Sequence, residues 1–356
     1  RAGFSDYRHT EYEGADIGTI FINQGIESRA ELVQANRGGW TGASGVQYFY
    51  RDFNAIGDEA FVPQNDTEQF AVFTLQEWHV GPFSIEGSAR YESTSIIARA
   101  QNVARRFNAV SGAVGVSMDV GATSKVGVNV ARTARAPSAE ELLSDGPHVA
   151  TASYERGSAD FTTERAWSVE AFAKLRAHGA TINLSAFSSW FDNFIYAADT
   201  GLIADDLPLF QYTQAKARYY GAEIELSAPI AQFGGYSLAV DGTGDVVRAR
   251  LAGGGNVPRI PPLRLRGGLD LSGTAISLRG EVEWSAAQNR TATYESATGA
   301  FTTINASAQW KAAHGVTLIL SADNLLDVVG RRHASYTKDF VPLTGRDIRA
   351  TVRLSF

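Results

Sequence analysis

The residues of this chain that could do chemistry are histidines with carboxylates close to them in sequence. The groups are His9 with Glu11 and Glu13, His148 with Asp145, and His333 with Asp339. Neutral imidazole and carboxylate oxygens are ligands that suit zinc. The chain contains no cysteine, so disulfides and thiolate metal sites are excluded. A metal site built from histidine and carboxylate is therefore a hypothesis, and it needs a fold that brings distant segments together.

Enzymatic chemistry has weaker support in the sequence. Ser144, Asp145 and His148 are close together, but a catalytic triad needs a nucleophile with an oriented base and an oxyanion site. The chain has no Gly-x-Ser-x-Gly motif, which would encode a strained nucleophile turn. The net charge of -6 gives no support for nucleic-acid binding. We therefore expect neither an enzyme nor a nucleic-acid-binding protein.

Most of the chain consists of segments in which apolar residues recur at every second position. Clear examples lie at 110–120, 126–130, 167–175, 182–186, 276–284 and 316–320. This spacing predicts β-strands, and no helical period competes with it over comparable length. Counting all such segments gives about sixteen strands. The last one ends at the carboxy-terminus, where Val352, Leu354 and Phe356 lie on one face and Arg349 and Arg353 on the other.

The predicted connections alternate between short and long. Short ones include 80–82, 121–122, 176–179, 272–274 and 312–315; long ones lie at about 10–16, 54–66, 97–106, 135–162, 194–208, 251–261, 289–300 and 327–343. No apolar run reaches the roughly 18 to 20 residues of a membrane-spanning helix. Alternating strands with loops sorted by length favour an all-β, transmembrane, antiparallel up-and-down β-barrel, with the long loops outside.

Charged residues alternate with apolar ones in several predicted strands. Glu223 and Glu225 lie between apolar neighbours, as do Glu281 and Glu283, and Arg264 and Arg266 supply the opposite charge on a segment between them. Such residues are expected on a wet inner face, where cross-strand ion pairs contribute a few tenths to about 1 kcal/mol each. We interpret this ladder as structural and not catalytic.

Several motifs carry a resemblance to a known family. The most specific runs from Arg135-Ala136-Pro137-Ser138 through Gly146-Pro147-His148 to Tyr154-Glu155-Arg156-Gly157. Others are Tyr7-Arg8-His9-Thr10-Glu11, Glu59-Ala60-Phe61-Val62-Pro63, Asn324-Leu325-Leu326-Asp327 and Pro342-Leu343-Thr344-Gly345-Arg346 before Phe356. Their order resembles the barrel of TonB-dependent outer-membrane receptors, most closely the branch of zinc-uptake receptors. Thr344 departs from the pattern, where a second proline is usual.

The resemblance implies an architecture and partners. Such receptors have about 22 strands around an amino-terminal plug domain. Residues 1–356 would then be the carboxy-terminal part of the barrel, amino-terminally truncated and without the plug. The implied function is active uptake of a scarce nutrient across the outer membrane of a Gram-negative bacterium, with energy from the TonB complex. The implied partners also include membrane lipids, lipopolysaccharide and the barrel-assembly machinery, which would read Phe356. A passive porin of sixteen strands is the alternative.

The resemblance also suggests site residues. Zinc-uptake receptors are similar in combining plug residues with a barrel glutamate and a histidine, which implies Glu11 or Glu13 together with His148. Zinc would be cargo, and no cofactor is expected. The competing interpretation is that His148 only braces its loop. Acidic residues in the expected outer loops, which include Asp58 and Glu59, would attract cations or simply favour solubility.

Overall fold

The structure is a computed structural model that describes residues 1–57 and 60–356. Asp58 and Glu59, expected to lie in an acidic outer loop, fall outside the described residues, and so does the side chain of Glu13.

The described residues form an all-β fold, as the alternation predicts. One sheet contains all eighteen described strands, accompanied by short helices. The elements are β1 (Ala2–Glu13), β2 (Asp16–Arg37), β3 (Trp40–Ile56), β4 (Asn65–Val80), β5 (Phe83–Ala98), β6 (Val103–Val120), β7 (Ser124–Arg135), α1 (Ala139–Leu143), β8 (Asp145–His148), the 3-10 helix η1 (Val149–Thr151), β9 (Ser153–Arg156), β10 (Glu164–Ala177), β11 (Ala180–Ala204), β12 (Leu207–Phe233), β13 (Tyr236–Leu251), β14 (Arg264–Ser272), β15 (Ile276–Ser285), β16 (Phe301–Ala313), β17 (Val316–Asp323) and β18 (Asp347–Leu354). No helix in the described ranges is long and apolar enough to cross a membrane.

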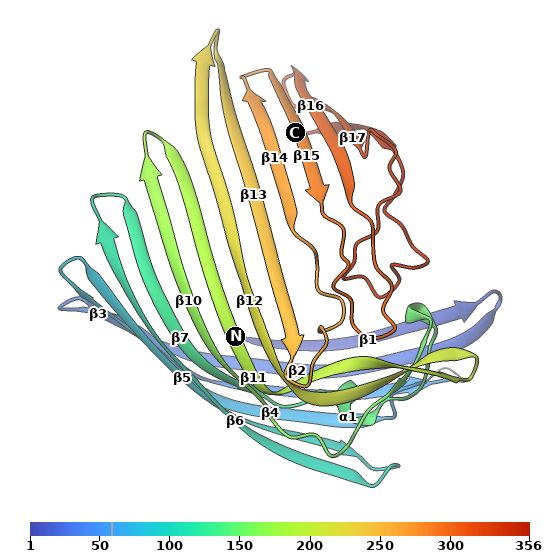
Figure 1. Ribbon diagram of the computed structural model, residues 1–356. Coiled ribbons are helices and arrows are strands. Elements are labelled where there is room, and N and C mark those ends of the chain that lie inside the picture. Colours follow the sequence, from blue (N-terminus) through green and yellow to red (C-terminus); the bar gives the residue numbers. More distant parts are fainter. Residues whose placement is uncertain (58–59) are drawn as a thin grey trace.

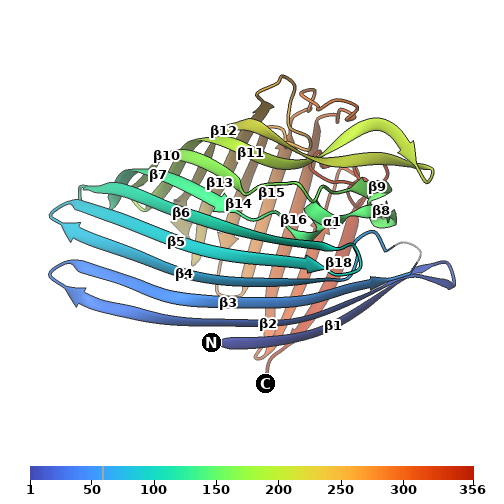
Figure 2. The same ribbon diagram turned by 90° about the horizontal axis from the view of Figure 1, so that it is seen from below.

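Sixteen of these strands pair in chain order. Each of β1 to β6 pairs antiparallel with the next, β7 pairs with β10, and the series continues to β18. The number agrees with the expectation of about sixteen. Strands β8 and β9 form a separate small hairpin, whose strand β9 runs parallel to β12. Figures 1 and 2 show the result as a strongly curved, trough-shaped sheet.

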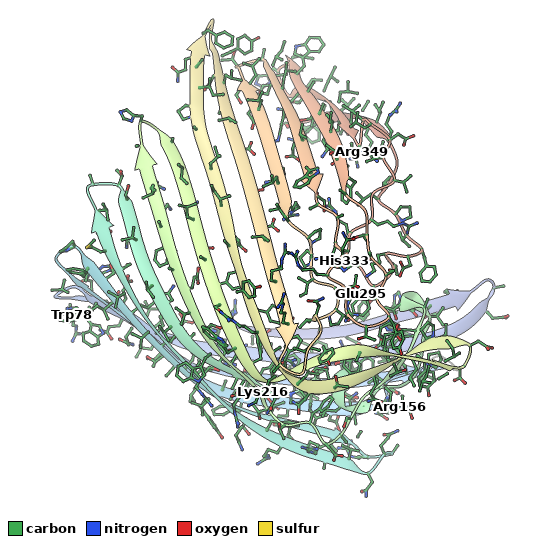
Figure 3. All side chains as sticks on the ribbon, in the orientation of Figure 1. Trp78, Arg156, Lys216, Glu295, His333 and Arg349 are labelled. Carbon is green, nitrogen blue, oxygen red and sulfur yellow. The ribbon has the colours of Figure 1, made fainter. Side chains whose placement is uncertain are left out.

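Short turns connect the strands along one rim of the sheet, at the upper left of Figure 1. Gly38 and Gly39 form one of these turns with φ of +64° and +85°. Two successive residues with positive φ match the twist of a tight hairpin, and glycine adopts them without steric cost. A Cβ on Gly39 would also lie 2.4 Å from the carbonyl oxygen of His79. Trp78 marks this rim in Figure 3.

The opposite end of the strands carries the longer connections, but two of them differ from expectation. The segment 10–16 was expected to be a loop; instead β1 and β2 continue through it and turn at residues 14–15. The segment 194–208 is likewise an extension of β11 and β12, with Asp205 and Asp206 at the turn. Cross-strand backbone pairing continues in both places, so these segments are long hairpins that extend the sheet.

The convex face of the sheet is apolar. Val114 on β6, Val130 on β7 and Val169 on β10 are consecutive register partners, so their side chains share one face. On β18, Val352 and Leu354 are both 62% exposed on this face, and Arg349 and Arg353 point to the other, as the alternation predicts.

The concave face carries the charged ladder. Arg279 contacts Asp241 at 2.6 Å and Glu281 at 2.8 Å, and it also contacts Asp270. Arg266 lies 3.8 Å from Glu281, which confirms one of the expected pairings. Arg264 instead pairs with Asp245 at 3.0 Å, because Asp245 is its register partner on β13. These pairs brace neighbouring strands and leave the ladder with a structural role.

Candidate functional site

The long connection between β7 and β10 folds onto the concave face. Its helix α1 begins with a capping box, in which Ser138 Oγ accepts a hydrogen bond from the backbone N–H of Glu141 and the Glu141 carboxylate accepts one from Ser138 N–H. Leu142 and Leu143 of this helix pack with Ile96, Phe107 and Ile195 in a buried cluster. The loop is therefore a packed element and forms part of the wall.

Arg135, from the Arg-Ala-Pro-Ser motif, fixes the base of this loop. Its guanidinium donates to both oxygens of Glu141 at 2.8 and 2.9 Å and to both oxygens of Glu164 at 2.9 and 3.1 Å. Glu164 also accepts a hydrogen bond from the backbone N–H of Ile195 at 2.8 Å. The arginine thus joins α1 to β10, and Glu164 extends the connection to β11. The planar fork of arginine provides this geometry and lysine does not.

His148 lies in hairpin β8–β9 and pairs with Glu155. Its Nδ1 is 2.8 Å from Glu155 Oε1, and the hydroxyl of Tyr212 donates to the other carboxylate oxygen at 3.0 Å. The ring of Phe61 stacks on the imidazole at 4.3 Å between centroids. Burial acts to raise the pKa of Glu155, but hydrogen bonds from His148, Tyr212 and Thr151 outweigh it, so the pKa lies below its ordinary value. Asp145, the expected partner of His148, pairs with Arg156 instead.

The remaining metal candidates lie on β1. His9 Nε2 is 3.4 Å from Glu11 Oε1, so the expected association of these two residues is present. In the described part of the chain, Glu11 forms no hydrogen bond or ion pair with His148. No group of three or more metal-ligating side chains occurs among the described residues. Glu11 therefore pairs with His9 and His148 pairs with Glu155, and this chain does not join the two pairs in one site among its described residues.

The Ser144, Asp145 and His148 group does not form a catalytic arrangement. Ser144 Oγ donates to the carbonyl oxygen of Glu140 at 2.6 Å, which closes the end of α1, and the histidine faces Glu155. Ser144 is held by a backbone carbonyl and His148 is turned to Glu155, so the pair lacks the nucleophile–base contact that acyl transfer requires.

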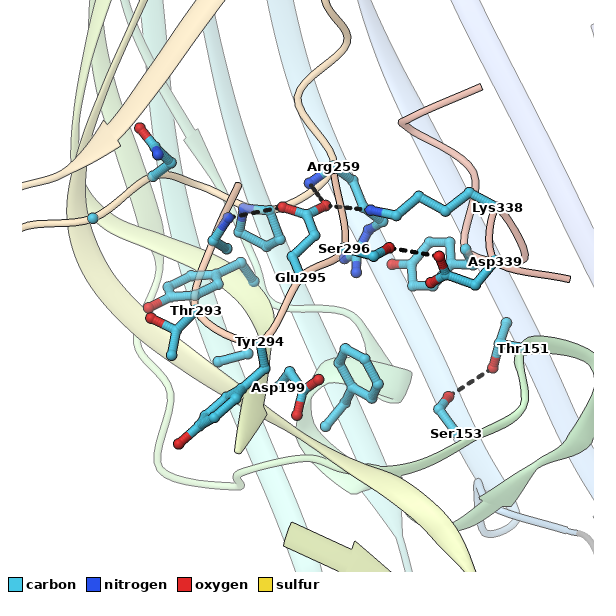
Figure 4. Close-up of a pocket in the computed structure, with 18 of the residues that line it drawn as sticks. Thr151, Ser153, Asp199, Arg259, Thr293, Tyr294, Glu295, Ser296, Lys338 and Asp339 are labelled. Carbon is cyan, nitrogen blue, oxygen red and sulfur yellow. Dashed lines mark hydrogen bonds and ion pairs between the residues drawn. The ribbon is translucent and has the colours of Figure 1, made fainter. Parts of the chain in front are cut away.

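A cavity of about 360 Å³ lies where five outer segments converge, and Figure 4 shows its lining. The segments are residues 151–153, the β11–β12 hairpin, and the connections 251–259, 292–296 and 335–339. Aromatic side chains supply much of the wall: Tyr196, Phe210, Tyr294 and Tyr336. The guanidinium of Arg259 lies 3.8 Å from the ring centroid of Tyr336. Aromatic walls with a few fixed polar groups are typical of small-molecule sites.

Glu295 holds three of these segments together, its own and those that contain Arg259 and Lys338. Its carboxylate accepts hydrogen bonds from Lys338 Nζ at 2.9 Å and from the backbone N–H groups of Arg259 and Ala292 at 2.8 and 2.9 Å. His333 Nε2 is 3.2 Å from the same carboxylate. Burial acts to raise the pKa of Glu295, but these contacts outweigh it and lower the pKa to about 2. Figure 3 shows Glu295 and His333 side by side in the trough.

His333 differs from expectation in its partner. The sequence suggested Asp339, but His333 is buried between Glu295 and Thr298, whose hydroxyl lies 3.0 Å from Nδ1. Asp339 accepts a hydrogen bond from Ser296 at 2.5 Å on the cavity wall. The sequence pattern singled out neither Glu295 nor Lys338, and it pointed to Glu155 as part of a motif and of an acidic outer loop, not as the partner of His148. Glu295 pairs with His333 and Lys338, which are far away in the chain, and Glu155 accepts a hydrogen bond from the distant Tyr212 as well as contacting His148 in its own hairpin. No local spacing signals the distant contacts.

The comparisons with known proteins concern almost the whole chain. The family described as TonB dependent receptor-like, beta-barrel matches residues 2–325. Solved structures with this fold include the copper transporter OprC, at 16% identity and a TM-score of 0.81, with 95% of this chain and 57% of that chain covered. The iron transporter FrpB of Neisseria meningitidis gives 13% identity and a TM-score of 0.73, with 95% and 55% covered.

A third similar structure is the ferric yersiniabactin uptake receptor FyuA of Yersinia pestis. It gives 16% identity and a TM-score of 0.68, with 99% of this chain and 57% of that chain covered. At these identities the structures show a shared fold. This chain spans a little over half the length of each of them.

Proposed function

This chain belongs to the TonB-dependent receptor β-barrel family, and we propose that it forms the wall and ligand-binding mouth of an outer-membrane receptor for a metal ion or metal chelate. The observation that carries the proposal is the cavity at which five outer segments meet. Its wall is held by buried ionic contacts at Glu295 and by the anchored loop at Arg135. Similar structures named as transporters of copper and iron, and as a ferric yersiniabactin uptake receptor, support this class of cargo.

The complete receptor contains more than this segment in our proposal. A plug domain inside the trough and a TonB-binding segment would supply gating and energy, in the outer membrane of a Gram-negative bacterium. The barrel-assembly machinery would recognise the terminal strand that ends at Phe356. These elements separate the proposal from the passive porin, because a porin conducts without TonB.

Zinc is the finer proposal for the cargo. The imidazole of His148 uses Nδ1 for Glu155, which leaves Nε2 as the nitrogen for a metal. Metal-ligating histidines in proteins usually donate their other N–H to a carboxylate in this way, and the contact fixes the ring and raises its basicity. Glu11 or Glu13 and residues of the plug would complete the site.

Uptake by the complete receptor tests both levels of the proposal. Cells with and without TonB are given labelled zinc, copper, ferric iron or a ferric chelate. Each strain expresses either the wild-type receptor or the double variant Tyr294→Ala with Tyr336→Ala. We expect uptake of one of these to need TonB and to fall in the double variant. Uptake that is independent of TonB would contradict active transport and favour the pore. Uptake of an iron or copper species in place of zinc would contradict the zinc proposal alone.

A further inference from the structure

A row of hydrogen-bonded polar side chains links β3 to β4. The Oε1 atom of Gln76 accepts a hydrogen bond from Trp40 Nε1 at 2.7 Å, and Gln76 Nε2 donates to Thr74 Oγ1 at 3.0 Å. The Oγ1 atom of Thr74 lies 2.8 Å from Ser44 Oγ. Because the indole N–H must face an oxygen, this contact also fixes the orientation of the Gln76 amide. We call Trp40, Ser44, Thr74 and Gln76 the polar row.

The polar row lies on the convex face of the sheet. Gln76 is the register partner of Gly87 on β5, and Gly87 is the register partner of Val114 on β6. Direct cross-strand partners have their side chains on the same face, so Gln76 shares the face of Val114. Thr74 lies two residues from Gln76, and Ser44 is its register partner, so both also belong to this face. The row therefore interrupts a surface that is otherwise apolar.

The depth of the polar row follows from two residues of β4. Trp78 and Glu68 lie on the convex face at opposite ends of the strand, and the outward positions between them carry no charge. At about 3.4 Å per residue and a strand tilt near 40°, the ten residues from one to the other cover about 26 Å, the height of the apolar band of a membrane barrel. Thr74 lies four residues from Trp78, which places it about 10 Å inside that border. Thr74 and Ser44 are therefore at the depth of the hydrocarbon.

The polar row does not satisfy all of its own hydrogen-bonding groups. In the described part of the chain, one N–H of Gln76 donates to Thr74 and the other has no acceptor. Ser44 is exposed, and its hydroxyl uses only the contact with Thr74, although a hydroxyl can donate once and accept twice. Hydrocarbon contains no water that could bind these groups. Polar side chains at this depth are typically satisfied by a contact with another membrane-spanning protein.

The chemistry of this surface fits a second copy of the same chain. The amide of Gln76 and the hydroxyl of Ser44 are neutral and both donate and accept, so the row can complement itself. Beside it on β5 are Gly87 and Ala89, and a Cβ on Gly87 would meet no atom within 4 Å, so the surface there is low enough for two sheets to approach closely. Leu32, the register partner of Ser44 on β2, is 77% exposed and offers apolar contact next to the row.

We propose that the complete receptor forms a two-fold dimer in the membrane through the convex face of β3 and β4. A two-fold axis along the membrane normal keeps both copies in the same orientation and brings residues near the axis opposite their own copies. Ser44 and Gln76 of each copy then donate to and accept from the polar row of the other. The interface is separate from the cavity between the outer segments, so both copies keep their ligand-binding mouths accessible.

Cross-linking of the complete receptor in outer membranes tests the location of the interface. In a background without other cysteines, one variant carries Val46→Cys, beside Ser44 on the convex face, and the control carries Leu320→Cys on the convex face of β17. With a short reagent that joins two thiols, we expect at least fivefold more covalent receptor dimer from the first variant. Equal yields would overturn the proposal, and so would a product that joins the receptor to a different protein.

Replacement of the polar row tests its chemistry. One variant combines Ser44→Ala and Thr74→Val, and the matched control makes the same changes at Ser188 and Thr302, which lie on β11 and β16. Apolar residues suit a lipid-facing surface, so both variants should assemble. We expect the dimer dissociation constant to rise on the order of tenfold in the first variant and to stay at the wild-type value in the control, because a two-fold interface loses each contact twice. Adding Gln76→Leu should weaken the dimer further.

Single-molecule photobleaching in vesicles measures this association. Labelled receptor is reconstituted at decreasing density, and the fraction of spots that bleach in two steps gives the dissociation constant. Wild-type receptor that is monomeric at every density would overturn the proposal. Equal dissociation constants for the row variant and the Ser188 and Thr302 control would do the same.

Discussion

His148 and Glu155 face each other across hairpin β8–β9, with Nδ1 of the imidazole 2.8 Å from Oε1 of the carboxylate. The carboxylate is almost completely buried, whereas the histidine side chain is 29% exposed. A carboxylate behind an imidazole holds one tautomer and one ring orientation. The same contact would serve a loop brace or a metal ligand, and mutations separate the two roles.

The double change Glu11→Ala with His148→Ala in the complete receptor should abolish high-affinity zinc uptake and leave the barrel folded. Each residue would supply a direct bond to the metal, while the barrel depends on its backbone ladder. Zinc-limited growth and direct zinc binding measure the effect, with His79→Ala as a control histidine outside the proposed site. Normal zinc binding in the double variant would remove the zinc assignment.

The single change Glu155→Gln tests the same site by removing the carboxylate that contacts Nδ1 of His148. If His148 binds zinc, the loss of the carboxylate should weaken zinc affinity by about 10- to 100-fold. If His148 only braces the hairpin, hydrogen exchange in residues 145–156 should increase and zinc affinity should stay the same. Calorimetry and hydrogen exchange on one preparation distinguish these outcomes.

The pH dependence of the mouth should follow Glu295. Because its pKa in the folded state is lowered to about 2 from 4.5, the carboxylate contributes stability that is fully present above about pH 4.5 and is lost as the pH falls toward 2. The contribution is on the order of 3 kcal/mol. Hydrogen exchange in residues 286–300 and 324–346 should therefore rise over this range. In Glu295→Gln it should already be high at neutral pH and change little on acidification.

Arg135→Ala should release the long loop without unfolding the sheet. The guanidinium is the common partner of Glu141 and Glu164, so its removal leaves two carboxylates facing each other. Because the arginine side chain is 43% exposed, we expect the local opening free energy of α1 to fall by only about 1 to 2 kcal/mol. Arg135→Lys should recover part of this loss. Hydrogen exchange that changes equally in α1 and in β15 would contradict a local role.

Deletion of Phe356 should reduce insertion into the outer membrane. Its side chain is fully exposed beyond the end of β18, so it makes little contribution to packing within the chain. The fraction of complete receptor in the outer-membrane pellet measures insertion, with Phe356→Tyr as the variant that keeps the aromatic ring. Equal insertion of the deletion variant would show that the assembly signal lies elsewhere.

The fold could be predicted from the sequence because its pattern is local. Val110, Val114 and Val116 reveal their shared face by spacing alone, and the structure places them on one exposed face of β6. The hairpin extensions could not be predicted in this way. Polar residues such as Asp199 and Asp205 predict a loop in this region. In the structure β11 continues through Asp199, because pairing with β12 satisfies its backbone hydrogen-bonding groups, and the chain turns only at Asp205.

The site was less predictable than the fold. Arg135 and His148 could be singled out from their motifs, but their partners Glu164 and Glu155 are chosen by how the loop packs on the sheet. His333 was paired with a sequence neighbour, Asp339, whereas the structure pairs it with Glu295, 38 positions away. Contacts between loops depend on three-dimensional proximity, and spacing along one segment contains no information about it.

The parallel ladder between β9 and β12 has a consequence for how antibodies would recognise the folded chain. Leu209, Phe210 and Gln211 are aligned with Tyr154, Glu155 and Arg156, so the patch around the exposed Arg156 is assembled from two segments that are distant in the sequence. An antibody raised against the folded receptor would recognise this patch as a discontinuous epitope. Neither peptide alone would compete for that antibody, and vaccination with linear fragments of these segments would miss it.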